Sequence, residues 1–202
     1  MPTTDPTRRG LLAGLAGTAL VAFAGPARAQ SGDKAAALVT TLAAEVTKLI
    51  NSGQSESRLY AAFEGILSRY GDMPAVAASV LGPPWRNASA AQKQQFVAAF
   101  QSYLARRYGS QFREYRNAKI VVKGTKDGGR AGTLVQTTVL RPGQEAVAVD
   151  WQVSDRSGAP KVVNLVIEGV SMLANERAEI GAMLEAARGD LDGLIAALRA
   201  RS

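Results

Sequence analysis

Asp150 and Glu168 are the residues of this chain whose type and spacing could support acid–base chemistry. Each lies in a stretch of alternating apolar residues, a pattern typical of a β-strand, and the two predicted strands are neighbours along the chain. Carboxylates that approach each other on neighbouring strands can serve as a general acid and a general base. The alternative is that both occupy solvent-facing positions of a half-exposed sheet, and the spacing favours this alternative.

The composition excludes several classes of catalytic site. The chain contains no His and no Cys, which removes Ser-His-Asp and Cys-His catalysis, His or Cys zinc sites, haem ligation by these residues, and disulfides. Residues 169–173 lack the second glycine of a nucleophile elbow, and the glycine-rich residues 124–132 lack the G-K-[ST] of a phosphate loop. We therefore expect no metal, no cofactor and no enzymatic activity.

The clearest remaining pattern is apolar and is concentrated in residues 145–172. Two runs have apolar side chains at alternate positions: Val147, Val149, Trp151 and Val153 in the first, and Val163, Leu165 and Ile167 in the second. This spacing gives each predicted strand one apolar face. Spacing alone favours an ordinary protein core behind that face, but a face that covers a bound ligand would show the same pattern.

The formal charge of +7 is spread along the chain without a dense run of Lys or Arg. Without residues 1–29 the chain keeps 21 basic and 16 acidic residues, which is a net charge of +5. A mildly basic surface suits an anionic lipid surface or an acidic partner protein. Nucleic acid is a poorly supported partner because no binding motif accompanies the charge.

The first 29 residues have the features of an export signal. Arg8 and Arg9 lie in a segment that resembles the twin-arginine motif, and an apolar run follows at residues 11–24. Ala27-Arg28-Ala29 then provides an A-x-A site, which predicts cleavage between Ala29 and Gln30. An uncleaved membrane anchor is the alternative, although the apolar run is shorter than the roughly 20 residues that a spanning helix needs. We expect a signal peptide at 1–29, one domain at 30–202 and a periplasmic location.

The periodicity of apolar residues predicts helices, then a sheet, then helices again. Helices are expected at residues 33–51, 55–70, 72–81 and 89–108, with a further turn to about 115 and a break at 81–87. The period changes to that of strands at Ala118, and four strands are expected at about 118–123, 133–140, 147–153 and 163–167. Residues 171–187 and 190–201 return to helix. Residues 168–171 are expected to form the turn into the first of these two helices.

The connections between the four predicted strands are short and polar, which predicts an antiparallel meander. Helices before and after such a sheet are typical of an α+β protein. We therefore expect an α+β fold in which N-terminal and C-terminal helices pack on one face of a four-stranded antiparallel sheet.

Two blocks of the sequence resemble the MlaC family, also called the toluene-tolerance auxiliary family. The first block contains Val80-Leu81-Gly82, Trp85, Ala88-Ser89, Gln92-Lys93, Phe96, Phe100, Leu104 and Tyr108. The second contains Glu168-Gly169-Val170-Ser171-Met172, followed by Asn175-Glu176-Arg177. The order and spacing of both blocks fit the family across residues 33–200. The chain departs from the family at Val163-Asn164, where relatives often carry an aromatic residue followed by Asp, and this departure affects the expected headgroup or partner contacts.

The resemblance implies a periplasmic carrier that passes phospholipid between an inner-membrane ABC transporter complex and an outer-membrane lipoprotein complex. It also implies an apolar cavity that holds the acyl chains between the sheet and the helices and leaves the headgroup exposed. A related branch of the family is associated with hopanoid lipids, so a triterpenoid cargo is an alternative. A non-enzymatic adaptor with a solid core is another. We expect a monomer.

The residues expected to contact the lipid are apolar side chains of the helices and of the sheet. They are Val80, Phe100, Tyr103, Leu104, Ile120, Val122, Val147, Val149, Trp151, Val163, Leu165, Ile167 and Met172.

Overall fold

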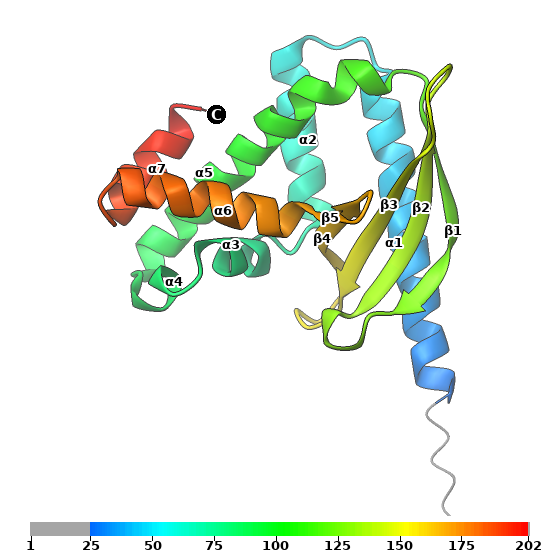
Figure 1. Cartoon of the computed structure of the whole chain (residues 1–202), viewed down its shortest axis with the longest axis horizontal. Helices are drawn as coiled ribbons and strands as arrows, with labels where there is room; N and C mark the ends of the chain where they lie inside the picture. Colours follow the sequence, from blue (N-terminus) through cyan, green and yellow to red (C-terminus); the bar gives the residue numbers. More distant parts are fainter. Residues whose placement is uncertain (1–24, 202) are drawn as a thin grey trace, which may run out of the picture.

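The computed structural model describes residues 25–201 of the chain, with side chains from residue 31 onward (Figure 1). The twin-arginine motif and the apolar run of the predicted export signal lie outside the described residues. Helix α1 (Gly25–Ile50) begins before the predicted cleavage position and continues beyond it. Within the described part of the chain, none of the helices combines the length and apolar character that crossing a membrane requires.

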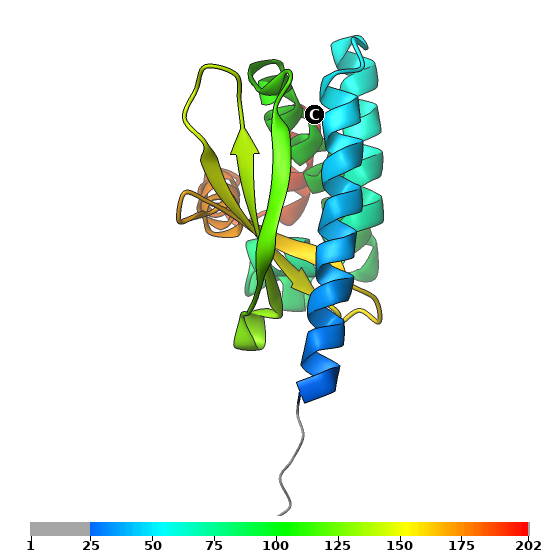
Figure 2. The same ribbon diagram turned by 90° about the vertical axis from the view of Figure 1, so that its right-hand side faces the viewer.

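The N-terminal half of the chain is helical, as its periodicity predicts. Helix α1 lies antiparallel to α2 (Glu56–Tyr70), and Figure 2 shows the two side by side. Helix α3 (Met73–Leu81), helix α5 (Ala90–Gly109) and the 3-10 helix η1 (Ser110–Tyr115) follow. The predicted capping box starts α5, because the Ser89 hydroxyl accepts from the Gln92 amide at 3.1 Å and the Gln92 side chain accepts from the Ser89 amide at 3.1 Å.

The break expected at residues 81–87 is shorter than predicted and contains a helical turn, α4 (Pro84–Asn87). Gly82 interrupts the helix with a φ of 70°, a conformation that suits glycine. Pro84 then occupies the first position of α4, where the missing proline N–H has no helical partner to lose. The two prolines therefore start a new turn and do not extend the break.

The sheet has five antiparallel strands in sequence order. They are β1 (Lys119–Asp127), β2 (Thr133–Leu140), β3 (Val147–Ser154), β4 (Lys161–Ile167) and β5 (Val170–Ser171). The expected number of four strands was wrong, because residues 168–171 contain a hairpin in addition to the turn. Glu168 and Gly169 have φ values of 48° and 80°, which lets a two-residue turn pair Val170 with Ile167.

The chain ends in α6 (Met172–Ala186) and α7 (Leu191–Arg199), so the class is α+β as predicted. Helix α1 packs on β1 and β2, while α3 and α6 pack on β4. Figure 1 shows the sheet and α1 on one side of the molecule and α3, α4, α6 and α7 on the other.

The buried side chains form two separate hydrophobic cores. The helical core joins α3, α5, α6 and α7 around residues such as Phe96, Ile180 and Leu194, all of which are fully buried. The sheet core joins α1, α2 and the sheet around residues such as Val39 and Val135. Residues of both cores face a space between them that protein side chains do not fill.

Candidate functional site

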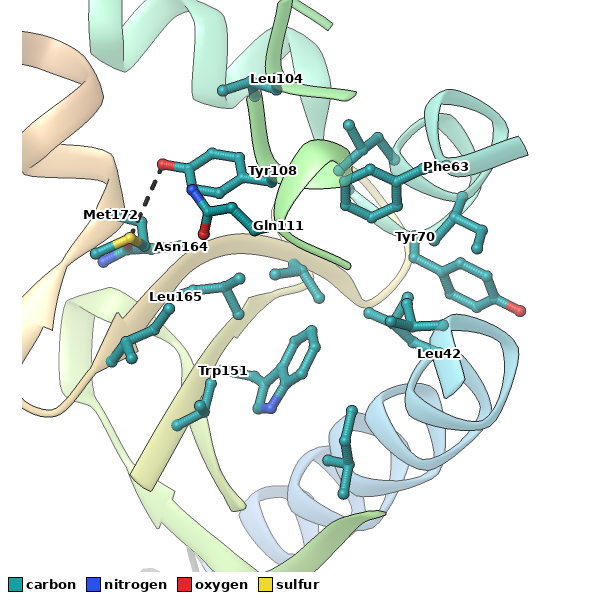
Figure 3. Close-up of a pocket in the computed structure, with 18 of the residues that line it drawn as sticks. Leu42, Phe63, Tyr70, Leu104, Tyr108, Gln111, Trp151, Asn164, Leu165 and Met172 are labelled. Carbon is teal, nitrogen blue, oxygen red and sulfur yellow. Dashed lines mark hydrogen bonds between the residues drawn. The ribbon is translucent and has the colours of Figure 1, made fainter. Parts of the chain in front are cut away.

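A cavity of about 290 Å³ lies between the helical core and the sheet core, and Figure 3 shows side chains that line it. Its wall takes residues from both cores, including Phe100 and Leu104 of the helical core and Val149 and Trp151 of the sheet core. The lining side chains are hydrophobic or aromatic, except at Thr47, Gly71, Gln111, Asn164 and Glu176. A largely apolar wall with a few polar groups is typical of a site for a small organic ligand.

The sheet wall of the cavity follows directly from strand alternation. On β3, Val147, Val149 and Trp151 point to the same face because side chains on a strand alternate. Val149 pairs with Ile167 of β4, and Trp151 pairs with Leu165, so these neighbours lie on the same face. All of them line the cavity.

The indole of Trp151 is fixed in this wall by a buried hydroxyl. Trp151 Nε1 donates to Thr137 Oγ1 at 2.9 Å, and Thr137 Oγ1 donates to the carbonyl oxygen of Val149 at 2.9 Å. Thr137 is 3% exposed and is one of the few buried polar residues of the described chain. Because Thr137 satisfies the indole N–H, the rest of the ring can border an apolar space without leaving a polar group unpaired.

The opposite wall comes from α1, α2, α5 and η1. Leu42, Val46 and Ile50 of α1 recur at every fourth position and all line the cavity. The rings of Phe63 on α2 and Phe112 on η1 meet edge to face, with centroids 4.7 Å apart. Both residues line the cavity, and Figure 3 shows Phe63 on the side opposite to Leu165 and Met172.

Tyr70 links this wall to α1 through a carboxylate. Its hydroxyl donates to Glu45 Oε1 at 2.5 Å, and Arg69 Nη2 contacts Glu45 Oε2 at 2.5 Å. Two hydrogen bonds lower the pKa of the Glu45 carboxyl below its ordinary value. The bond from Tyr70 has the larger effect, and the bond from Arg69 has the second largest. Glu45 is therefore held ionised, and α1 and α2 are held together beside the cavity.

A cluster of polar side chains lies at the boundary between the cavity and the helical core. The Tyr108 hydroxyl donates to Glu176 Oε1 at 2.6 Å, and Arg107 Nε lies 3.3 Å from the same oxygen. The Arg107 guanidinium also donates to the Tyr103 hydroxyl at 2.6 Å. Glu176 is only 4% exposed, and this burial raises the pKa of its carboxyl, against the effects of Tyr108 and Arg107.

The second polar group of the wall is Asn164, which joins β4 to the start of α6. Its amide nitrogen donates to the Ser171 hydroxyl at 3.0 Å, and its Oδ1 accepts from the Leu173 amide at 2.9 Å. Asn164 therefore helps to satisfy the first turn of α6, where backbone N–H groups have no partner within the helix. These contacts show that Asn164, although it departs in residue type from the family pattern, connects β4 to the start of α6.

Ten of the thirteen residues predicted to contact lipid line the cavity. They are Phe100, Leu104, Ile120, Val147, Val149, Trp151, Val163, Leu165, Ile167 and Met172. The other three are not among the lining residues: Val80 and Tyr103 belong to the helical core, and Val122 packs against the sheet core. Whether any of the thirteen contacts a lipid stays a prediction.

The prediction omitted the contribution of α1 and α2, including Leu42, Val46, Phe63 and Tyr70. The apolar stripe on α1 was visible in the sequence as a helical repeat, but such a stripe indicates only that a face is buried. Tyr108 was visible as part of the first family block, and Glu176 as part of the second. Their direct contact joins residues 68 positions apart, which no local pattern indicates.

Neither carboxylate of the acid–base alternative is among the residues that line the cavity. Glu168 lies in the β4–β5 turn, and its carboxylate accepts a hydrogen bond from the Ala148 amide. Asp150 pairs across the sheet with Val166, on the face opposite to the cavity wall. No hydrogen bond joins the two carboxylates in the part of the chain that the structure describes. Over the same residues, no group of three or more Asp and Glu side chains is arranged to hold a metal ion.

Comparisons with known proteins give a fold neighbour and a curated relative. A solved phospholipid-binding protein from Ralstonia solanacearum, in complex with a phospholipid, matches with a TM-score of 0.71 and 24% identity. The match covers 83% of this chain and 96% of that one, so the two share a fold.

The curated relative is the intermembrane phospholipid transport system binding protein MlaC of Haemophilus influenzae. It is 26% identical over 108 residues, which are 52% of this chain and 50% of the relative, so the match spans about half the length of each protein. The family model described as MlaC protein matches residues 40–200, which include the cavity wall from Leu42 to Glu176. The chain belongs to the MlaC family.

Proposed function

We propose that this protein is a carrier that binds a phospholipid by burying its acyl chains in the cavity between sheet and helices. The observation that carries the proposal is the apolar cavity between two complete hydrophobic cores. The relatives support it, since one was solved with a phospholipid and the other is described as part of an intermembrane phospholipid transport system.

The chemistry of the wall is sufficient to hold acyl chains. Each methylene taken out of water contributes about 0.8 kcal/mol, so affinity requires neither an ion pair nor a catalytic group. The volume of about 290 Å³ is just below the roughly 300–1,000 Å³ that is usual for ligand sites. Two long acyl chains need more room, so loading of a diacyl lipid is expected to move the sheet away from the helices.

The exposed side chain at the cavity wall indicates where the headgroup lies. Gln111 of η1 is exposed and lines the cavity, as does the polar side chain of Asn164 (Figure 3). A lipid headgroup is strongly hydrated, so it is expected to occupy this polar opening while the acyl chains extend toward Phe63 and Trp151. This orientation leaves the headgroup accessible to a partner protein.

Membership of the MlaC family supports a wider role for this carrier. The carrier is proposed to work in the periplasm, without enzymatic activity, between an inner-membrane ABC transporter complex and an outer-membrane lipoprotein complex. Replacement of Arg8 and Arg9 by lysine tests the export step, since it should stop the protein from reaching the periplasm. N-terminal sequencing of the exported protein is expected to begin at Gln30.

Lipid binding itself is tested by native mass spectrometry of the protein purified from the periplasm, and by capture of lipid from vesicles. Co-purification of phospholipid, and its capture by protein from which lipid has been removed, are the expected results. Absence of both would overturn the proposal and favour an adaptor. Both relatives are named for phospholipid, and the mass of the extracted ligand would also detect a hopanoid cargo.

A further inference from the structure

Glu176 has one carboxylate oxygen without a hydrogen-bond partner. Its Oε1 accepts from Tyr108 and lies near Arg107, as described above. Its Oε2 is buried and has no partner among the described residues. A buried polar atom without a partner is unusual in a folded protein, because it loses its hydrogen bonds to water and gains nothing in return.

The position of Glu176 relates this oxygen to the cavity. Glu176 lies one helical turn beyond Met172 on α6, and both residues line the cavity. Their neighbour across the cavity boundary is Tyr108, whose hydroxyl contacts both Glu176 Oε1 and Met172 Sδ. The carboxylate is therefore one of the few polar groups in a largely apolar wall, and its orientation is fixed by Tyr108 and Arg107.

The charge state of the carboxylate determines what it can bind. Arg107 supplies a positive charge 3.3 Å from Oε1, and Tyr108 is a hydrogen-bond donor to the same atom. In the ionised form, which the hydrogen bond from Tyr108 and the charge of Arg107 favour, the carboxylate has only acceptor capacity left at Oε2. A phosphate oxygen or an ester carbonyl has no hydrogen to offer it, whereas an ammonium or a hydroxyl group does.

We infer that Glu176 Oε2 is a hydrogen-bond acceptor for the polar part of the cargo, and that the cavity selects lipids whose headgroup carries an N–H or O–H donor. This inference rests on the proposed lipid-carrier function and adds a chemical preference to it. Hydrogen bonds to charged groups are the stronger ones, so the preference is expected to be on the order of tenfold.

Two pairs of lipids with the same acyl chains test the preference. Phosphatidylethanolamine and phosphatidylcholine have the same net charge, but only the first has N–H donors. Phosphatidylglycerol and phosphatidylmethanol also have the same net charge, but only the first has hydroxyl donors. Protein without bound lipid is mixed with vesicles that contain one pair in equal amounts, and the captured lipid is extracted and measured by mass spectrometry.

The wild-type protein is expected to capture the donor-bearing lipid in excess in at least one pair. An excess in the first pair assigns an ammonium, and an excess in the second assigns a hydroxyl. In Glu176→Gln the ratio is expected to approach one, because the amide nitrogen can replace the acceptor oxygen. Glu185→Gln is the matched control: it makes the same change on α6, at an exposed carboxylate, and it should keep the wild-type ratio.

The outcomes separate this inference from the proposed function. Equal capture within both pairs by the wild-type protein overturns the headgroup contact but leaves the lipid carrier intact, as would be the case if water occupied the site. An unchanged ratio in Glu176→Gln also overturns it. Failure to capture any of the four lipids overturns the carrier function and this inference together. The wild-type ratios require no variant, so the test does not depend on the folding of Glu176→Gln.

Discussion

Trp151 and Thr137 are joined by a hydrogen bond of 2.9 Å that fixes the largest side chain of the sheet wall. The bond lies on the cavity side of the sheet, where β2 and β3 are adjacent. It allows an amphipathic ring to form part of an apolar surface. The position of Trp151 therefore depends on a threonine that is itself buried, as well as on the apolar side chains around the ring.

Replacement of Thr137 by valine is expected to destabilise the protein by about 1–3 kcal/mol, because it leaves the indole N–H unpaired in a buried position. Valine has nearly the shape of threonine, so the effect isolates the hydroxyl. Urea unfolding measures it. The control is Thr138→Val, the neighbouring residue whose side chain lies on the opposite face of β2, and the change there is expected to stay within about 0.5 kcal/mol. Equal effects at both sites would contradict the assignment.

Gly71 lies where the end of α2 reaches β4, and alanine is expected to be poorly tolerated there. A Cβ at this position would lie 2.7 Å from the carbonyl oxygen of Leu67 and 3.3 Å from Met73 Sδ. Crowding of this kind in a packed interior typically costs about 1–3 kcal/mol. The loss should appear as a lower midpoint of urea unfolding.

Gly65→Ala on the same helix is the matched control for this prediction. A Cβ there would meet Arg69 Nη1 at 3.5 Å, which is an ordinary contact. Alanine in a helix interior is favoured over glycine by roughly 0.5–1 kcal/mol, so this variant should be more stable than the wild type. A stabilising effect of Gly71→Ala would show that the close approach to Leu67 does not exist in solution.

Val149→Arg and Val166→Arg are expected to affect lipid capture differently. Val149 is buried in the cavity wall, whereas Val166 pairs with Asp150 on the other face of the sheet. A charge at Val149 should therefore abolish capture from vesicles, and a charge at Val166 should leave most of it. Equal loss in both variants would mean that the lipid does not lie on the predicted face.

A variant without a buried charge separates loss of lipid binding from loss of folding. Ile167→Trp adds volume to the same wall next to Val149, but it buries no charge. It should reduce the amount of captured lipid while the far-ultraviolet circular dichroism stays that of the wild type. Unchanged capture by this variant would count against the cavity as the acyl-chain site.

The stability of the protein should carry a pH-dependent contribution from Glu176. Burial raises the pKa of its carboxyl in the folded protein above the ordinary value of 4.5. Between these two pKa values the folded state binds more protons at this site than the unfolded state does. The contribution is therefore complete below the ordinary value and is lost as pH rises through the raised pKa.

The difference in unfolding free energy between the wild-type protein and Glu176→Gln isolates this contribution from those of other carboxyls. That difference should move in favour of the wild type as the pH is lowered from neutral toward 4.5. Urea unfolding at a series of pH values provides the measurement. A difference that is independent of pH would show that the carboxyl titrates alike in both states.

The sequence predicted the regular elements well because their apolar periods are strong. Strand β2 has the predicted bounds, and the capping box at Ser89 and Gln92 gave the start of α5. Strand β5 was missed because two residues are too short to show alternation. Its turn also contains a non-glycine residue with positive φ, Glu168, which turn composition does not indicate.

The cavity could be predicted only in part, for a physical reason. Alternation on β3 and the helical stripe on α1 indicate buried faces, but they do not reveal whether a face is buried against protein or against empty space. The family resemblance supplied that distinction. The contact between Tyr108 and Glu176 depends on how α5 and α6 cross, and neither helix encodes it locally.

Because residues of both hydrophobic cores line the cavity, a lipid bound there would contact both and become part of the folded interior. A ligand that binds only the folded state stabilises it by an amount that grows with saturation, about 2.7 kcal/mol at a concentration one hundred times the Kd. Limited proteolysis should therefore digest the empty carrier faster than the loaded one. In the cell, turnover by proteases would then remove unloaded molecules first, and the abundance of the protein would follow the supply of its lipid.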